Sequence, residues 1–159
     1  NMEMPIPHDN SNIVSSWDVL NGQEVTGDCV VIGGGLVGAE TAEYLANKGH
    51  QVTIVEMMDK IAAGESTTVL PLMMKDFADH NVKQLVNTKV DHIENNIVYT
   101  ANEQIKADTI INALGSKKNI FDDSSITIPH VYVGDCSGER TADIASAIRT
   151  AYHVANAID

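Results

Sequence analysis

The pattern of apolar and polar positions is clearest between residues 28 and 56. A continuous apolar run is followed by closely spaced glycines, then by apolar positions at helical spacing, and then by a second apolar run. This order predicts a strand over 28–33, a helix over 36–48 and a second strand over 51–55. The right-handed crossover rule makes the two strands parallel, and their continuous apolar character is typical of strands covered on both faces.

Residues 57–86 predict a loop, a helix and a third strand. The helix contains Pro71 in its first turn, where a fixed φ is favourable, and it runs to about His80. A short strand over 82–86 follows it. A hydroxyl side chain is expected to cap the helix start, from one of three consecutive residues: Ser66, Thr67 or Thr68.

Beyond residue 88 the pattern changes to short strands separated by turn residues. Strands are expected over 89–94, 97–100 and 104–106, as an antiparallel meander in the place of a third helix. A buried strand over 107–113 then ends at Leu114-Gly115, where Gly115 would let the backbone meet a ligand at the glycine turn. The predicted fold class is therefore α/β, a Rossmann-like three-layer fold with a central parallel sheet and an antiparallel β-meander crossover.

The two ends of the chain are less regular. Residues 1–27 predict an extended lead-in with a short helix around Trp17 to Leu20, capped by Ser15 or Ser16. Near the other end we expect a strand over 130–133 that ends in Gly134-Asp135, and an amphipathic helix over 141–158. Three parts follow: a lead-in over 1–27, a central domain over 28–117 and a tail over 118–159.

Composition excludes several classes of function. The chain has 159 residues, 43% of them hydrophobic, and a formal charge of −12. Such an acidic chain argues against a nucleic-acid surface and against an anionic membrane as partners. The two cysteines form no C-x-x-C pair, and no apolar run reaches 18 residues, so we expect neither a zinc site nor a membrane span, and a cytoplasmic location.

The glycines after the first strand form G-x-G-x-x-G, the pattern of a dinucleotide-binding turn. Gly33 allows a tight turn, Gly35 lets a pyrophosphate approach the backbone, and Gly38 lets the helix pack close to the strand. Free N–H groups at the helix start favour a phosphate. The candidate cofactor-binding residues here are Gly33, Gly34, Gly35, Leu36, Val37 and Gly38.

Glu56 ends the second strand, where a carboxylate accepts hydrogen bonds from ribose hydroxyls, and Met57 follows it. This acid favours NAD(H) over NADP(H), because it repels a 2′-phosphate and no arginine occurs before Arg140. FAD domains use the same turn and the same acid, so the motif alone leaves FAD open. We find no catalytic constellation and no metal-ligand cluster, so any chemistry belongs to a bound cofactor.

The order of motifs resembles that of the pyridine nucleotide-disulfide oxidoreductase superfamily. The motifs are V-V-I-G-G-G-L-V-G, then a meander, then A-D-T-I-I-N-A-L-G, then V-Y-V-G-D-C. They are most similar to the C-terminal part of NADH:flavin oxidoreductases of the 2-enoate reductase and 2,4-dienoyl-CoA reductase group. The resemblance implies that residues 28–117 bind NAD(P)H and that Gly134-Asp135 belongs to a split FAD domain, with the aspartate holding the ribityl or phosphate region.

The resemblance also indicates what this sequence lacks, namely a second glycine motif, the barrel domain and an iron–sulfur cysteine cluster. The chain therefore looks like a fragment whose partners are the missing FAD and barrel domains of a parent enzyme. That parent would pass hydride from nicotinamide to FAD, in a reaction similar to that of enoate reductases or NADH oxidases. Two alternatives remain open: an FAD-binding domain, and a Rossmann-like assembly module without catalysis. The apolar stripe of the last helix is expected to dock on the central domain or to form a homodimer.

Overall fold

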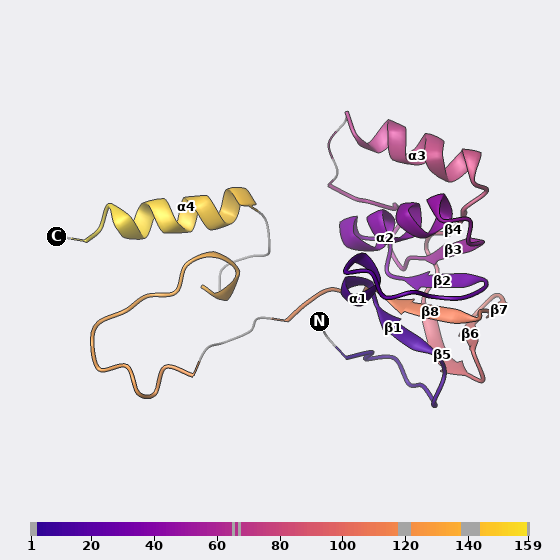
Figure 1. Cartoon of the computed structure of the whole chain (residues 1–159), viewed down its shortest axis with the longest axis horizontal. Coiled ribbons are helices and arrows are strands. Elements are labelled where there is room, and N and C mark those ends of the chain that lie inside the picture. The colour runs from indigo at the N-terminus through magenta and orange to yellow at the C-terminus, as the bar shows by residue number, and fades with distance from the viewer. Residues whose placement is uncertain (1–2, 65, 67, 118–121, 138–143, 159) are drawn as a thin grey trace. The chain divides into compact units, whose positions relative to one another are not determined.

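The chain folds into two compact units, residues 1–116 and residues 117–159. The computed structural model describes residues 3–64, 66, 68–117, 122–137 and 144–158 (Figure 1). The first unit contains the sheet that the sequence predicts, and the second contains a helix. Among the described residues, none of the helices is both long enough and apolar enough to pass through a bilayer.

A parallel sheet of five strands forms the middle of the first unit, in the spatial order β1-β8-β2-β3-β4. Central β2 pairs with β8 on one side and with β3 on the other, so that Val30 lies between Ile110 and Thr53. The chain runs from β2 outward to β4 and returns to the opposite side of β2 as β8. Ligands bind at such a reversal in open α/β sheets, at the carboxyl ends of the strands. The strands are β1 (Ile13–Ser15), β2 (Cys29–Ile32), β3 (Val52–Val55), β4 (Lys83–Leu85) and β8 (Thr109–Asn112).

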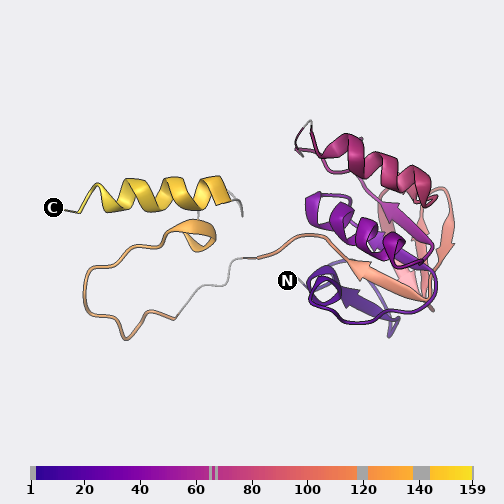
Figure 2. The same ribbon diagram turned by 45° about the horizontal axis from the view of Figure 1, so that its top comes forward.

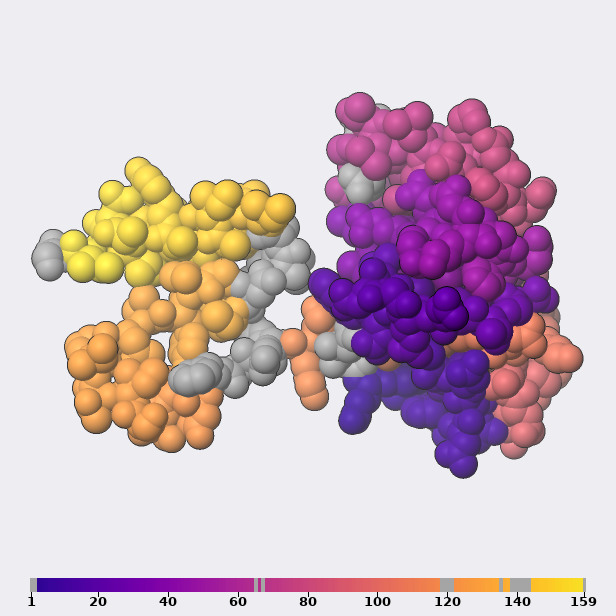
Figure 3. Space-filling view, in the orientation of Figure 1, coloured from indigo at the N-terminus to yellow at the C-terminus, as the bar shows by residue number. Residues whose placement is uncertain are grey.

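Helices cover one face of the sheet and a meander covers the other (Figures 1 and 2). Alternate residues of the central strand point to opposite faces, as expected for a pleated strand. Val31 joins the core under the helices with Leu45 and Phe77, whereas Ile32 joins the core under the meander with Ile93. The helices are α1 (Ser16–Leu20), α2 (Leu36–Asn47) and α3 (Leu70–Asp79), and their atoms lie side by side in Figure 3. The meander consists of β5 (Val90–Glu94), β6 (Ile97–Thr100) and β7 (Gln104–Lys106).

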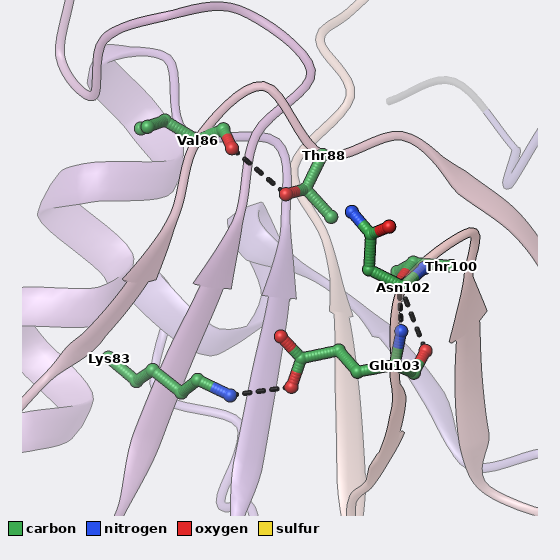
Figure 4. Close-up of polar contacts among 6 residues, drawn as sticks. All are labelled: Lys83, Val86, Thr88, Thr100, Asn102 and Glu103. Atoms are coloured by element: carbon green, nitrogen blue, oxygen red, sulfur yellow. Dashed lines mark hydrogen bonds and ion pairs between the residues drawn. The ribbon is translucent and has the colours of Figure 1, made fainter.

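The turn between β6 and β7 is fixed to the edge of the parallel sheet (Figure 4). Lys83 on β4 forms an ion pair with Glu103, with 2.6 Å between Nζ and Oε2. Thr100 closes the turn, because its Oγ1 accepts the N–H of Asn102 and of Glu103 and donates to the Glu103 carbonyl at 3.0 Å. The ion pair is half-exposed and contributes at most about 1 kcal/mol, so the turn and the buried face position the meander.

The predicted fold class is confirmed, with two corrections to the predicted elements. Residues 13–15, which the sequence left within the lead-in, form β1 and pair with β8. A three-residue strand is too short to show a period. The prediction of a strand over 130–133 is wrong, because those residues pair with no strand within the described part of the second unit.

Caps of the predicted helices are partly as expected. Ser15 caps α1, since its side chain accepts the N–H of Trp17. At α3, Ser66 accepts the N–H of Val69 at 3.2 Å, one turn ahead of the helix, while the N-cap residue itself has no side-chain bond. Thr67, another predicted cap, lies outside the described residues.

The second unit contains a short 3-10 turn, η1 (Gly134–Cys136), and helix α4 (Ile144–Ala155). They contact each other, and the N–H of Gly134 donates to Oγ1 of Thr150 at 2.9 Å. The first residues of the predicted helix, 141–143, lie outside the described part. The predicted apolar stripe is exposed, with 81% of Ile144 and 64% of Ile148 accessible to solvent.

Candidate functional site

Two glycines of the G-x-G-x-x-G turn are required by the fold. Gly33 has φ +101°, a region that side chains disfavour, and a Cβ there would lie 2.6 Å from the Ala113 carbonyl oxygen. A Cβ on Gly38 would lie 1.9 Å from the carbonyl oxygen of Gly33, so helix α2 packs directly on the turn. Gly35 differs, because a Cβ there would have no atom within 4 Å. Gly35 therefore leaves open space beside the backbone.

Helix α2 begins at this open side of the turn. Its N-cap residue is Gly35, which supplies no side-chain cap. Among the described residues, nothing accepts a hydrogen bond from the N–H groups of Gly35, Leu36 and Val37. Leu36 is exposed and Val37 half-buried. Free N–H groups and the positive end of the helix dipole favour an anion at this position.

Glu56 connects the end of β3 to the glycine turn. It is 9% exposed, and its two carboxylate oxygens accept the N–H of Gly34 at 2.6 Å and the N–H of Met58 at 2.7 Å. A carboxylate oxygen accepts more than one hydrogen bond, so capacity remains for a ligand hydroxyl. The sequence predicted a ribose acceptor here, but not the hydrogen bond that holds the turn.

A mostly apolar pocket of about 290 Å³ lies beside Glu56, on the meander side of the sheet. Glu56 and the 66%-exposed Met57 line it at the end of β3, and the ends of β2 and β8 contribute further wall. Its position at the carboxyl ends of parallel strands is where α/β sheets bind ligands. The complete lining is Pro5, Ile6, Ile32, Gly33, Val55, Glu56, Met57, Thr88, Lys89, Val90 and Leu114.

The loop after β3 returns over the glycine turn, which sequence reasoning missed. The N–H of Ala62 donates to the carbonyl of Gly34 at 2.7 Å, and Ala62 has φ +50°. The Ile61 side chain covers the same glycine, because a Cβ there would lie 2.5 Å from Ile61 Cδ1. A loop without a hydrophobic period gives no signal for such a contact.

Three more residues were predicted to belong to the site: Gly115, Gly134 and Asp135. Gly115 has φ +98° and follows β8, but Ala113 and Leu114 are the residues that approach Gly33 or its pocket. Gly134 and Asp135 belong to the second unit, and the side chain of Asp135 lies outside the described part. The structure thus brings together residues 33–38 with Glu56 and Met57.

Cys29 lies at the start of β2, at the other end of that strand from the glycine turn. Burial raises the pKa of the Cys29 thiol to about 11, so it is protonated in the core at neutral pH. Within the described ranges, no group of three or more histidine, cysteine, aspartate or glutamate residues is arranged to hold a metal ion.

A parallel sheet with a glycine turn, an open helix start and an acid after the next strand is typical of a Rossmann-like nucleotide-binding protein. The chain belongs to the pyridine nucleotide-disulphide oxidoreductase family, because the sequence pattern of that family matches residues 3–151. This confirms the resemblance found in the sequence. The family implies a flavin and a nicotinamide cofactor.

Known relatives include reductases of larger size. The chain is 43% identical to bilirubin reductase of Mediterraneibacter gnavus, covering 96% of this chain and 24% of that protein. It is 31% identical to cinnamate reductase of Clostridium sporogenes, covering 92% of this chain and 23% of that protein. The structure resembles that of 2-naphthoyl-CoA reductase in complex with 2-naphthoyl-CoA, with a TM-score of 0.78 at 27% identity, over 98% of this chain and 25% of that one. The chain thus spans about a quarter of the length of these relatives.

Proposed function

We propose that residues 28–116 bind NAD(H) as the nicotinamide-nucleotide site of a flavin-dependent reductase. The observation that carries this proposal is the open space at Gly35 beside the free N–H groups of Leu36 and Val37. A pyrophosphate at this position would receive backbone N–H groups and the helix dipole. The adenosine ribose would donate to Glu56, and its adenine would enter the apolar pocket next to Met57.

The proposal favours NAD(H) over NADP(H). Glu56 is held in place by two backbone N–H groups, so it cannot swing away from a 2′-phosphate without leaving both donors unsatisfied. The first arginine of the chain is Arg140. Among the residues that line the pocket, Lys89 is the basic one.

We propose that the flavin binds to a larger protein of which this site would form a part. Within the described residues one dinucleotide turn is present, and the Gly134 N–H of the second unit already donates to Thr150. We therefore assign no step to the flavin on this chain. When bound, NADH supplies a hydride, and its acceptors in the relatives are proposed to be a flavin and then an unsaturated substrate or oxygen. The role of this chain is to bind and orient the nucleotide.

Equilibrium titration of the 159-residue chain with NADH, NADPH and FAD tests the proposal. We expect saturable NADH binding with a Kd below about 1 mM, and NADPH binding at least about tenfold weaker, which corresponds to about 1.4 kcal/mol. Tighter binding of FAD than of NADH would instead favour a flavin at this turn. Failure to saturate at millimolar NADH would favour an assembly module without nucleotide.

A further inference from the structure

The N-terminal lead-in forms an isolated β-bridge with the edge strand of the meander. His8 pairs in parallel with Ile93 of β5. The N–H of Ile93 donates to the carbonyl of Pro7 at 2.9 Å, and the N–H of Asp9 donates to the carbonyl of Ile93 at 3.3 Å. Backbone pairing at a sheet edge fixes the register of the added segment.

Side chains of the lead-in also hold the turn between β5 and β6. Oδ2 of Asp9 accepts the N–H of Asn95, and Oγ of Ser11 accepts the N–H of Asn96, each at 2.9 Å. In return, the side-chain oxygen of Asn96 accepts the N–H of Asn12 at 2.7 Å. Residues 7–12 are therefore attached to the meander at a defined position.

This attachment directs the preceding residues to the proposed nucleotide pocket. Pro5 and Ile6 line that pocket, opposite residues from the strand ends. Ile6 is half-buried and packs against the core under the meander, which includes Ile32 and Val55. A wall of the pocket thus comes from a segment far from the glycine turn in the sequence.

We infer that Ile6 is a binding residue of the nucleotide site, which packs against the adenosine end of NAD(H) and couples nucleotide binding to docking of the lead-in on β5. The inference rests on the proposed NAD(H) function and concerns the same site. Its physical basis is the shared apolar wall: a nucleotide in the pocket buries Ile6 further, and a docked lead-in presents Ile6 to the nucleotide. Coupling of two binding events is reciprocal, so each stabilises the other.

Affinity measurements with two matched variants of the full chain test this coupling. Ile6→Ala should weaken the binding of NADH and of ADP-ribose about three- to tenfold, because it removes apolar contact from the pocket. Met4→Ala is the control, since Met4 is also half-buried and packs against the same core but does not line this pocket. It should change either affinity less than about twofold.

Unchanged affinity in Ile6→Ala, or an equal loss in Met4→Ala, would overturn the inference while leaving the proposed function standing, because the unmodified chain would still bind NADH. Absence of NADH binding to the unmodified chain would remove both. Hydrogen exchange of the unmodified chain gives a second test that needs no variant. Saturating NADH should slow exchange at the amides of Asp9 and Ile93, and unchanged rates there would also overturn the inference.

Discussion

The three glycines of the turn differ in what surrounds them. Gly33 and Gly38 are required for folding, whereas Gly35 is available for the proposed ligand. A methyl group on Gly38 would overlap a backbone carbonyl, whereas one on Gly35 would enter open space. We expect Gly38→Ala to lower the free energy of unfolding by more than about 3 kcal/mol, the range of severe packing defects. Gly35→Ala should lower it by about 1 kcal/mol or less, as for an exposed N-cap position. Urea unfolding of both variants checks this, and equal effects would contradict the geometry.

Glu56 serves the fold as well as the proposed ribose contact. Glu56→Ala leaves the N–H groups of Gly34 and Met58 without their acceptor, which costs about 1–3 kcal/mol at the buried Gly34 donor and less at the exposed Met58. Glu56→Gln retains one oxygen acceptor and should be less destabilised. Both should bind NADH more weakly. Urea unfolding of the two variants measures the structural role of Glu56, and NADH titration measures its proposed role in binding. If the Ala variant is as stable as the unmodified chain, the structural role is contradicted.

Among the elements, those with a clear period could be predicted from the sequence. The apolar runs of β2 and β3, the helix between them and the three strands of the meander were predicted near their observed bounds. β1 could not be, because three residues at the sheet edge obtain their conformation from β8. The contact of Ile61 and Ala62 with Gly34 was equally hidden, since it depends on how a loop folds back.

The polar segment before η1 contains a pH-dependent contact. His130 has one ring nitrogen 3.0 Å from the Ile128 carbonyl and the other 2.7 Å from Asp123 Oδ2, so the imidazolium satisfies both acceptors. Hydrogen bonds to Ile128 and then to Asp123 raise the pKa of His130 above 6.5. Hydrogen bonds from the Tyr132 hydroxyl and then from His130 lower the pKa of Asp123 below 3.8.

The contact should be most stable between about pH 4 and pH 6.5. The histidine contribution is fully present below 6.5 and is lost as pH rises through the raised pKa. The aspartate contribution is present above 3.8 and is lost as pH falls through the lowered pKa. Proton NMR titration should show a lower pKa for His130 in Asp123→Asn than in the unmodified chain. The same His130 pKa in both proteins would contradict the contact.

The second unit carries exposed apolar side chains on α4 and just beyond its last residue, Ala155. Ile144, Ile148 and Ile158 are exposed, with 74% of Ile158 accessible, and contiguous apolar surface usually marks an interaction site. We propose that this stripe forms a homodimer of the chain. Sedimentation should show self-association at tens of micromolar, which Ile148→Glu abolishes. Ala145→Glu, an exposed position outside the stripe, is the control, and a monomeric unmodified chain would contradict the proposal.

Some residues of the site could be predicted from the sequence, whereas others could not. The glycines and Glu56 carry a local motif, so their candidate role was readable from residues 28–56 alone. Pro5 and Ile6 carry no motif and reach the pocket only because residues 7–12 pair with the meander. Long-range placement of this kind is decided by tertiary contacts and not by local pattern.

We propose that the backbone at Gly35 receives the pyrophosphate of NAD(H). Calorimetric titration of NADH into the unmodified chain and into Gly35→Val tests this expectation, because a Cβ at this position has no atom within 4 Å and the valine methyl groups would extend into the proposed pyrophosphate space. We expect saturable binding to the unmodified chain and at least about tenfold weaker binding to a variant of near-normal stability. Equal affinity for the two proteins would contradict it.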